Sequence, residues 1–374
     1  MKFDFLIVGA GFSGAVLAER IASQLNKKVL IIDKRDHIGG NAFDEPDKNG
    51  ILVHKYGPHI FHTQSSKPYD YLSQFTEWHK YEHRVLGSVD GELIPIPFNF
   101  DSLHQCFPKE FADKLEEKLI SKFGEGIKIP ILKLKEDKDE DIRILADYIY
   151  NKVFSNYTKK QWGMTPEELD PSVSSRIPVM LGRDDRYFQD EYQQLPSKGY
   201  TEVFKKMLNH PNITLRLNTE FKSLQEVEYD YLIYTGAIDE YFNYEFGALP
   251  YRSLRFQFEN VAQTEFQPVS QVNYPNEHDF TRITEFKHFL NQKREATTIA
   301  YEYPEQFEEG KNERFYPIPQ KPNQELYEKY KEKANTLPNV FFAGRLAEYK
   351  YYNMNEIIAV ALLVFDTKIK KLYL

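Results

Sequence analysis

The segment from Phe3 to Asp33 constrains the fold more strongly than any other part of the chain. It opens with a mostly apolar run at residues 3–8, which is typical of a buried parallel strand. Gly9–Gly14 follows at once with the sequence GAGFSG, which fits the pattern G-x-G-x-x-G. In this pattern the first glycine permits a tight turn, the second lets the backbone approach a pyrophosphate, and the third lets the following helix pack close to the strand.

A helix and a second strand complete this unit. Residues 15–21 place apolar side chains at helical spacing, and the N-terminus of such a helix directs unpaired N–H groups at an anion. Residues 28–33 predict a second buried strand ending in Asp33, about 20 residues past the last glycine, where a carboxylate binds a ribose 2′-hydroxyl. A glycine-rich turn that binds nothing is the alternative, but the order of these elements favours a dinucleotide site. We therefore expect an α/β fold with a Rossmann-like domain.

The residues after Asp33 bear on which dinucleotide binds. Gly39 and Gly40 follow the acid after a short spacer, an arrangement that resembles the extended signature of the FAD-binding family that contains the amine oxidases. No second G-x-G-x-x-G occurs in the chain, whereas a flavoprotein reductase with its own nicotinamide domain usually carries two. We therefore expect FAD as the cofactor and no built-in NAD domain.

Charge and cysteine content exclude several classes of protein. The net charge is −8 without a basic block, which argues against nucleic acid as the main partner. Cys106 is the one cysteine, so no disulfide can form within the chain and a cytoplasmic location is expected. No apolar run reaches the ~18 residues that a membrane span needs.

His59 and His62 have the spacing of metal ligands, but no acids or cysteines cluster with them, so we expect no metal.

Hydrophobic patterning divides the rest of the chain. Residues 84–97 contain two apolar runs around a central Asp-Gly, which predicts a β-hairpin, and Pro95 and Pro97 indicate that its second strand lies at a sheet edge. Apolar residues then recur at helical spacing, and later they alternate as in an antiparallel sheet. We thus expect three domains: a discontinuous FAD-binding domain at 1–83, 198–250 and 325–374, a helical substrate domain at 100–197, and an antiparallel sheet domain at 84–99 and 251–324.

Arginines and polar aromatic residues crowd the stretch from Phe154 to Phe188, where glycines and prolines predict much loop. Such a loop is more typical of a binding surface than of a core. Near the C-terminus, residues 339–344 predict a strand that runs into Gly344, and residues 357–363 predict a buried helix. This closing strand, glycine and helix would bring Gly344 near the FAD pyrophosphate or the flavin, although an ordinary α/β closure also explains the pattern.

The chain resembles bacterial UDP-galactopyranose mutases over essentially its full length. The most specific match is Gly344–Tyr352, with the sequence GRLAEYKYY; the others are residues 9–14, 34–41, 56–63, 157–163, 176–179, 187–188, 246–249 and 281–283. Such enzymes interconvert UDP-galactopyranose and UDP-galactofuranose with reduced FAD and no net redox change, through an adduct of flavin N5 and the sugar. The resemblance also implies a cytoplasmic homodimer, an external reductant such as NAD(P)H, and a role in supplying galactofuranose for cell-surface polysaccharide.

The resemblance assigns roles to individual residues. The diphosphate would be bound by Arg176, Arg282, Tyr187, Tyr316 and Tyr351. The uracil would be held by Phe154, Tyr157 and Asn273, and Trp162 would ride on a mobile loop that closes over the nucleotide. Phe188 and Asn353 complete the substrate set. His62 would join the two arginines in catalysis, and the alternative is that His62 has only a structural role. The cofactor set is Gly9, Gly11, Phe12, Ser13, Gly14, Asp33, Lys34, Gly40, Asn41, His59, Ile60, Gly344, Arg345 and Met354.

No Asp/Glu or Ser/His constellation stands out as a nucleophile, which agrees with flavin N5 performing the covalent step. Three departures from the family pattern concern the sugar: Asn353 replaces a typical Asp, Met180 replaces a common Arg, and the loop before Arg282 is one residue short. They leave the reaction class intact, and a 2-acetamido sugar is a further candidate substrate. Two alternatives remain: an FAD-dependent oxidoreductase of the amine-oxidase type, and a non-catalytic UDP-sugar-binding homologue.

Overall fold

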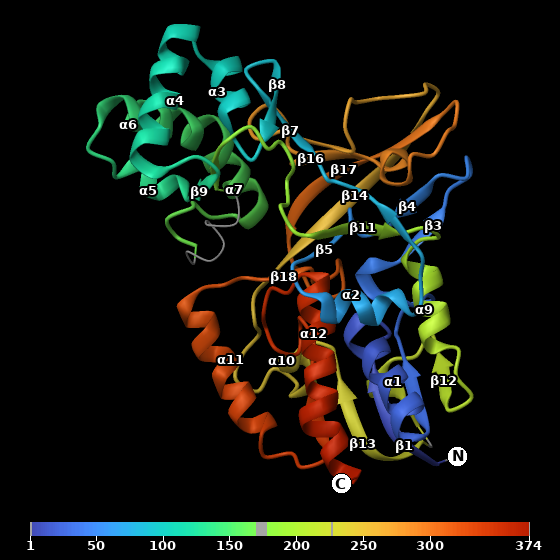
Figure 1. The fold of residues 1–374 in the computed structure, drawn as a ribbon. Helices are drawn as coiled ribbons and strands as arrows, with labels where there is room; N and C mark the ends of the chain where they lie inside the picture. The colour runs from blue at the N-terminus through green and yellow to red at the C-terminus, as the bar shows by residue number, and fades with distance from the viewer. Residues whose placement is uncertain (1, 170–177, 226, 374) are drawn as a thin grey trace. The chain divides into compact units, whose positions relative to one another are not determined.

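A computed structural model describes residues 2–169, 178–225 and 227–373 (Figure 1). The chain divides into two compact units. Unit 1 consists of residues 1–80, 190–252 and 307–374, and unit 2 consists of residues 81–189 and 253–306. Each unit is therefore assembled from segments that are far apart in the sequence.

Unit 1 is organised around a five-stranded sheet with the order β12-β2-β1-β13-β19. Every pairing in it is parallel. The strands are β1 (Lys2–Val8), β2 (Val29–Ile32), β12 (Ile213–Arg216), β13 (Glu228–Tyr234) and β19 (Val340–Phe342). The middle of β1 and all of β2 are buried, as central strands of a parallel sheet must be, so the two strands predicted from the N-terminal pattern are confirmed.

The helices of unit 1 are α1 (Phe12–Leu25), α2 (Ser66–Ser73), α9 (Tyr200–Leu208), α10 (Ile238–Tyr241), α11 (Lys321–Ala334) and α12 (Met354–Val364). α1 packs against α9 and α12, and Figure 1 shows α1 and α12 side by side. α1 begins at the glycine turn and is capped after Leu25 by Asn26, which has a left-handed backbone (φ 53°) and donates its N–H to the carbonyl of Ile21. Residues 15–18 of α1 are wholly buried, so the helix is enclosed by its neighbours.

Short elements complete unit 1. β3 (Asp44–Pro46) and β4 (Leu52–His54) form a hairpin, and β5 (Phe61–Thr63), β11 (Tyr192–Pro196) and β6 (Trp78–Lys80) form an antiparallel sheet in that order. β18 (Tyr316–Pro317) pairs with the first two residues of β14 (Tyr251–Val261). The remaining turns are the 3-10 helices η1 (Gly40–Ala42), η3 (Phe221–Ser223) and η6 (Lys370–Tyr373) and the π-helix η5 (Phe365–Ile369).

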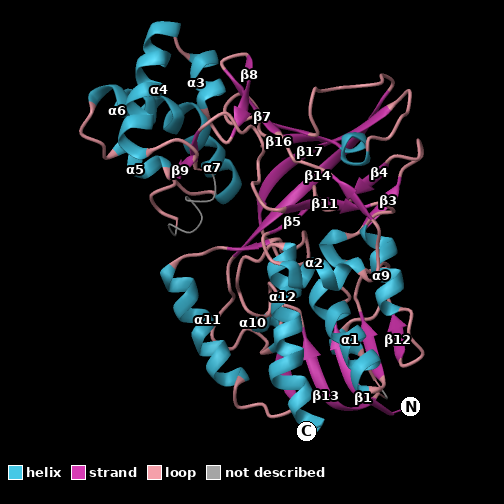
Figure 2. Ribbon diagram, viewed as in Figure 1, coloured by secondary structure: helices cyan, strands magenta, loops and turns pink. Residues whose placement is uncertain are grey.

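Unit 2 combines a sheet with a group of helices (Figure 2). Its main sheet has the order β14-β17-β16-β15-β7-β8, with β7 (Val85–Val89), β8 (Glu92–Ile96), β15 (Gln271–Asn273), β16 (Arg282–Glu285) and β17 (Thr297–Gln306). β9 (Ile127–Ile129) and β10 (Val179–Leu181) form a separate antiparallel pair. The helices among its described residues are α3 (Phe100–Cys106), α4 (Lys109–Phe123), α5 (Ile131–Lys135), α6 (Glu140–Ile149), the π-helix η2 (Tyr150–Phe154), α7 (Ser155–Trp162) and the 3-10 helix η4 (Phe286–Leu290).

The division into two units differs from the three predicted domains. Val85 and Ile94 of the β7–β8 hairpin share one hydrophobic core with apolar residues of α4 and α6, so the hairpin joins the helices and the sheet in unit 2. Residues 190–197 belong to unit 1 because β11 pairs with β5 and β6. Residues 307–324 also belong to unit 1, where β18 pairs with Tyr251 and Arg252.

Two predictions about the sheet of unit 2 have different outcomes. The hairpin predicted at residues 84–97 is β7–β8, and β8 lies at the sheet edge, as its prolines predicted. The sheet is not antiparallel throughout, however, because β15 runs parallel to β7. Parallel neighbours need a long crossover connection, and the chain between β8 and β15 supplies it by passing through the helical segment.

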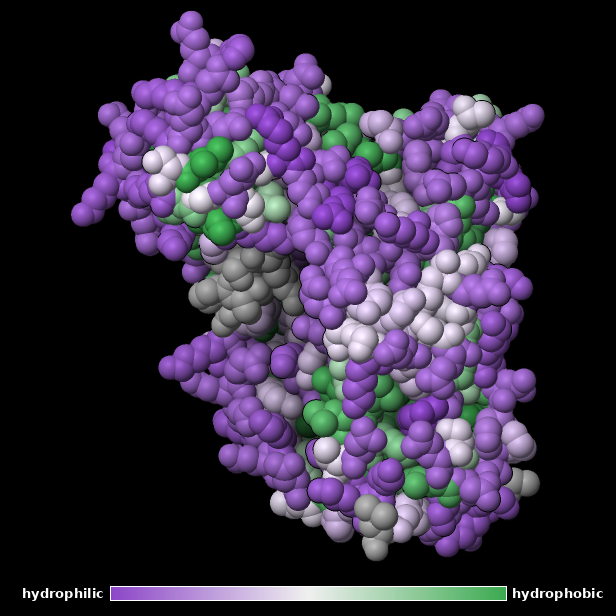
Figure 3. All heavy atoms as spheres, viewed as in Figure 1, coloured by the Kyte–Doolittle hydropathy of each residue, from purple (hydrophilic) through white to green (hydrophobic). Residues whose placement is uncertain are grey.

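Polar and charged residues cover most of the surface shown in Figure 3, and hydrophobic residues gather there in small patches. Within the described ranges, no helix combines the length and the apolar character that crossing a membrane requires.

Candidate functional site

A cavity of about 980 Å³ opens in unit 1 at the carboxyl ends of β1, β2 and β13. Val8, Asp33 and Tyr234 stand at these strand ends and line it. In open parallel sheets of this kind, ligands bind in the crevice at the carboxyl ends of the strands. The cavity therefore lies where the glycine pattern predicts a bound dinucleotide.

The glycine turn between β1 and α1 is built so closely that no side chain fits at two of its positions. Gly9 has φ +102°, and a Cβ there would lie 2.1 Å from the hydroxyl oxygen of Thr235. A Cβ at Gly14 would lie 1.9 Å from the carbonyl oxygen of Gly9. Gly14 thus sits behind the turn, where it lets α1 approach the strand.

Gly11 and Gly40 form a backbone-lined cradle in the same cavity. A Cβ added at Gly40 would lie 3.1 Å from the Cα of Gly11, so the two turns meet there without side chains. Gly11 is the N-cap residue of α1, no side chain caps this helix end, and its first turn holds no acid. Backbone N–H groups at such a helix end attract phosphate oxygens. These residues fit the pyrophosphate of a dinucleotide cofactor.

Asp33 stands in the cavity wall with only 9% of its surface exposed. One carboxylate oxygen accepts the N–H of Ala10 at 2.8 Å, and the other accepts the N–H of Arg35 at 3.0 Å. Through these two hydrogen bonds, Asp33 connects the glycine turn to the segment that follows β2.

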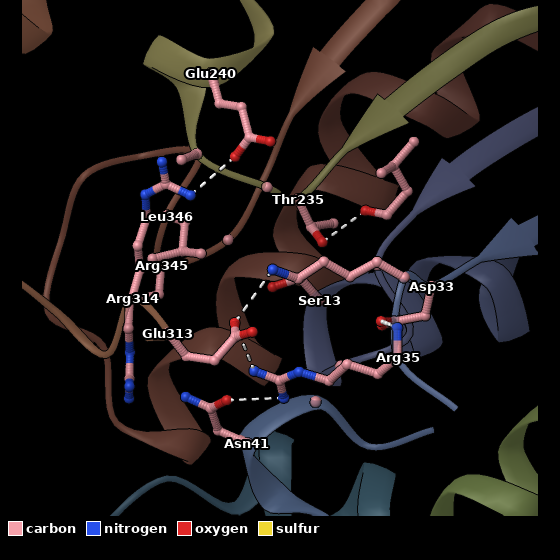
Figure 4. Close-up of a pocket in the computed structure, with 18 of the residues that line it drawn as sticks. Ser13, Asp33, Arg35, Asn41, Thr235, Glu240, Glu313, Arg314, Arg345 and Leu346 are labelled. Carbon is pink, nitrogen blue, oxygen red and sulfur yellow. Dashed lines mark hydrogen bonds and ion pairs between the residues drawn. The ribbon is translucent and has the colours of Figure 1, made fainter. Parts of the chain in front are cut away.

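Residues 307–315 form a wall of the cavity that sequence reasoning missed. Glu313 pairs with Lys34 and Arg35, at 3.3 Å in both cases, and Arg35 also donates to the side-chain oxygen of Asn41 at 3.0 Å. Arg314 donates to Glu240 at 2.9 Å, and Figure 4 draws both side chains among those that line the cavity. Burial alone would raise the pKa of Glu313, but Arg35 and Lys34 hold that pKa below its ordinary value.

Most residues predicted to bind the cofactor line this cavity: Gly9, Gly11, Phe12, Ser13, Asp33, Lys34, Gly40, Asn41, His59, Gly344, Arg345 and Met354. Gly14 and Ile60 do not line it. Besides residues 307–315, the missed lining residues include 219–222 and 235–237. These two stretches follow β12 and β13, so the strand-end rule could have found them, whereas nothing local marks residues 307–315.

The rings of His54, which is buried, and His59, which is partly exposed in the cavity wall, lie close to one another. Burial lowers the pKa of His54 to about 3. Its Nδ1 accepts the backbone N–H of His59 at 3.0 Å, which only the unprotonated ring can do. Burial and the neighbouring His54 also lower the pKa of His59 to about 3. Both rings are therefore neutral at physiological pH.

The other predicted site residues of unit 1 occupy three places. Tyr316 and Tyr351 stack with ring centroids 5.1 Å apart, and the guanidinium of Arg345 lies over both rings. Asn353 caps α12 in a reciprocal capping box with Glu356. His62 does not line the cavity, and its Nδ1 lies 2.9 Å from a carboxylate oxygen of Asp190.

Unit 2 brings together the three residues predicted to hold the uracil. Phe154, Tyr157 and Asn273 line a small cavity of about 20 Å³ with Gly87 and Ile96. The cavity therefore joins the η2–α7 segment, the end of β15 and the β7–β8 hairpin.

Arg282 pairs with a carboxylate of the neighbouring strand β17. Its guanidinium lies 2.9 Å from Glu302, which is 2% exposed. Burial raises the pKa of Glu302, and the charge of Arg282 opposes that shift. Tyr187 and Phe188 pack around the ring of His83, and Trp162 is the last residue of α7. Arg176 lies outside the described residues.

Metal ligands do not cluster in the described part of the chain: no group there of three or more His, Cys, Asp or Glu residues could hold an ion.

The fold and the cavity of unit 1 define a dinucleotide-binding α/β protein. Residues 7–75 match the family model described as an NAD(P)-binding Rossmann-like domain. The crystal structure of a reduced UDP-galactopyranose mutase superposes with a TM-score of 0.76 at 16% identity, over 99% of this chain and 94% of that one. At this identity the likeness concerns the fold alone.

Residues 152–351 match the family model of UDP-galactopyranose mutase. The probable UDP-galactopyranose mutase of Klebsiella pneumoniae is 36% identical over 97% of this chain and 94% of its own length. The dTDP-fucopyranose mutase of Escherichia coli is 34% identical over 96% of both chains. The chain belongs to the UDP-galactopyranose mutase family of flavin-dependent isomerases. The predicted family, enzyme class and flavin cofactor are thus confirmed, and the amine-oxidase alternative is disfavoured.

Proposed function

We propose that the protein interconverts UDP-galactopyranose and UDP-galactofuranose with reduced FAD bound in the cavity of unit 1. The observation that carries the proposal is the 36% identity over 97% of the chain with a protein named as a probable UDP-galactopyranose mutase. The cavity of about 980 Å³, with its glycine cradle and helix N-terminus, supports it independently because it suits a dinucleotide as large as FAD.

The cofactor would be held mainly by backbone groups. The N–H groups at the start of α1 would bind the pyrophosphate, Gly11 and Gly40 would leave room for it, and Asp33 would face a ribose. When bound and reduced, the flavin supplies an electron-rich nitrogen that can act as a nucleophile toward the anomeric carbon. The neutral ring of His59 at the cavity wall would add no positive charge beside it.

The substrate residues are proposed on the family resemblance and on their chemistry. Arg282, held by Glu302, and Arg176 would bind the diphosphate, because guanidinium groups make charge-assisted bonds to phosphate oxygens of ~1.5–3 kcal/mol each. The hydroxyls of Tyr187, Tyr316 and Tyr351 would add hydrogen bonds to the same group.

The other substrate contacts follow from the shape of the base and the sugar. Phe154 and Tyr157 offer flat faces for the uracil, and Asn273 offers an amide for its edge. Trp162 and Phe188 would enclose the nucleotide. Asn353 and His62 would lie toward the sugar and the flavin.

A second candidate substrate comes from the comparison with dTDP-fucopyranose mutase, which is nearly as similar at 34% identity. The same ring contraction on a dTDP-6-deoxy sugar would use the same arginines and a base pocket that admits the thymine methyl group. A UDP-2-acetamido sugar is a third candidate, since Asn353 and Met180 depart from the family pattern.

The test is turnover by the flavin-loaded protein. Dithionite-reduced protein is incubated with UDP-galactofuranose, and in parallel with dTDP-fucofuranose, and the products are resolved by anion-exchange chromatography. We expect UDP-galactopyranose from the reduced protein and none from the oxidised protein. Conversion of the dTDP sugar alone would shift the assignment to the second candidate, and equal rates in both redox states would contradict the role of the reduced flavin.

The identity of the flavin and the setting of the enzyme complete the proposal. Heat should release FAD, and recovery of FMN on HPLC would contradict the dinucleotide site. We further propose a cytoplasmic homodimer, reduced by an external donor such as NAD(P)H, that supplies galactofuranose for cell-surface polysaccharide. Sedimentation of the purified protein tests the dimer, and the rate of flavin reduction by NADPH tests the donor.

A further inference from the structure

The stacked rings of Tyr316 and Tyr351 come from separate segments of unit 1. Tyr316 belongs to β18, whereas Tyr351 lies in the loop that leads into α12. Their ring planes meet at 26°, and Arg345 lies over both. The hydroxyls of two such tyrosines can bind one diphosphate only if the distance between the two segments stays fixed.

The side chain of Tyr349 connects these two segments. It is 1% exposed, and its hydroxyl donates to the carbonyl of Pro250 at 2.6 Å and accepts the N–H of Ile318 at 3.2 Å. Ile318 lies two residues after Tyr316, and Tyr349 lies two residues before Tyr351. One hydroxyl therefore ties together the backbones that carry the stacked pair.

The backbone of Tyr349 adopts a conformation that large side chains rarely take. Its φ is 44°, in the left-handed region, and its ring packs against Tyr251 and Tyr327. The preceding turn is closed by bonds from the N–H groups of Glu348 and Lys350 to the carbonyls of Gly344 and Arg345. A strained residue persists only where its surroundings fix it, and here the buried ring and its hydroxyl do so.

We propose that Tyr349 is a positioning residue for the diphosphate site. Its left-handed backbone turns the chain back toward β18, and its hydroxyl sets the spacing of Tyr316 and Tyr351. The inference rests on the proposed function, in which the hydroxyls of these two tyrosines bind the diphosphate.

The test compares Tyr349→Phe with a matched control, Tyr330→Phe, in the FAD-loaded protein. Tyr330 is 0% exposed, and its hydroxyl likewise donates to a carbonyl, that of Gly247, at 2.6 Å and accepts an N–H, that of Phe246, at 3.0 Å. Both variants should lose a similar amount of Tm, because each loses a hydroxyl that donates to one backbone carbonyl and accepts one backbone N–H. In calorimetry with UDP as the probe, Tyr349→Phe should raise Kd about tenfold and Tyr330→Phe less than about twofold.

A double variant separates positioning from general damage. In a Tyr351→Phe background, Tyr349→Phe should weaken UDP binding by less than about twofold further, because its effect passes through the stacked pair. A full tenfold loss in that background, or unchanged UDP binding by Tyr349→Phe alone, would overturn the inference. If Tyr316→Phe and Tyr351→Phe both bind UDP as the wild type does, the proposed diphosphate role fails first, and the inference fails with it.

If Tyr349→Phe does not retain its flavin, the inference is tested instead by hydrogen exchange of the wild-type protein with and without UDP. UDP should slow exchange of the Ile318 amide and of residues 349–352 together. Protection confined to one of these segments would overturn the inference.

Discussion

The cavity of unit 1 is shaped mainly by backbone, whereas the small cavity of unit 2 is shaped mainly by side chains. The first, of about 980 Å³, owes its shape to strand ends and to glycines that allow no added side chain, whereas the second, of about 20 Å³, is closed by side chains such as Phe154 and Ile96. A site shaped by backbone tolerates no added atoms. A site shaped by side chains loses affinity in steps when single groups are removed. Gly14→Ala and Arg282→Ala test this difference, and two smaller effects concern His54 and Asn353 of unit 1.

The largest effect is expected for Gly14→Ala. Helix propensity alone favours alanine over glycine by about 1 kcal/mol, yet the new Cβ would lie 1.9 Å from the carbonyl oxygen of Gly9. The turn must therefore open, and the flavin absorbance of the purified protein should fall at least about tenfold. Gly182→Ala, with its nearest neighbour at 3.9 Å, is the control and should keep its flavin. Full flavin content in Gly14→Ala would show that the turn is less rigid than its geometry implies.

Arg282→Ala should abolish most turnover while the flavin stays bound. It removes charge-assisted bonds from unit 2 and leaves the backbone cradle of unit 1 intact, so kcat/KM should fall about 100-fold or more. Arg255→Ala is the control, because Arg255 forms an exposed ion pair with Glu305 in the same sheet. Loss of flavin from Arg282→Ala would contradict a role of Arg282 in substrate binding alone, and near-native kcat/KM would make Arg282 structural.

Acid should destabilise unit 1 through the buried side chain of His54. The folded-state pKa of His54 is lowered to about 3, so its stabilising effect is complete above the unfolded value of 6.5 and is lost as the pH falls toward 3. Between these values the unfolded chain binds one more proton, which costs up to about 1.4 kcal/mol per pH unit. Urea titrations at pH 7, 6 and 5 should show a shallower loss for His54→Asn than for the wild type. Parallel slopes would contradict a neutral His54.

The smallest effect is expected for Asn353→Asp, which restores the residue typical of the family. Asn353 caps α12 through its side-chain oxygen, and Asp caps a helix equally well, so the free energy of unfolding should change by less than about 0.5 kcal/mol. Turnover should change by less than about threefold. A gain of tenfold or more would instead give the carboxylate a direct part in the chemistry.

The dinucleotide fold was predictable because its signals are local. The run from β1 through Gly9 and Gly14 to Asp33 lies in one short stretch, and each residue acts through backbone geometry that sequence spacing specifies. The hairpin around Asp90 and Gly91 was predictable for the same reason.

What sequence could not provide depends on pairings between distant segments. Glu302 meets Arg282 because β16 and β17 place them opposite each other, and no spacing rule reveals that register. Glu313 reaches Arg35 from the far end of the chain, and its segment carries no motif. The left-handed Tyr349 would be expected as glycine or asparagine from its backbone alone. The substrate residues of unit 2 were named through family resemblance, since their positions have no periodicity of their own.

Because unit 1 is assembled from three chain segments, elements that pack together emerge from the ribosome at different times. β1 and β2 leave the ribosome early, but β13 lacks its neighbour β19 until residue 342 has emerged, and α1 lacks α12 until residue 364 has emerged. At ~5–20 residues per second, α1 waits roughly 15–70 s for α12. Throughout that interval the face of α1 that packs on α12 needs protection, which a chaperone can give. Newly made protein should therefore acquire its yellow colour only after the last helix has been released.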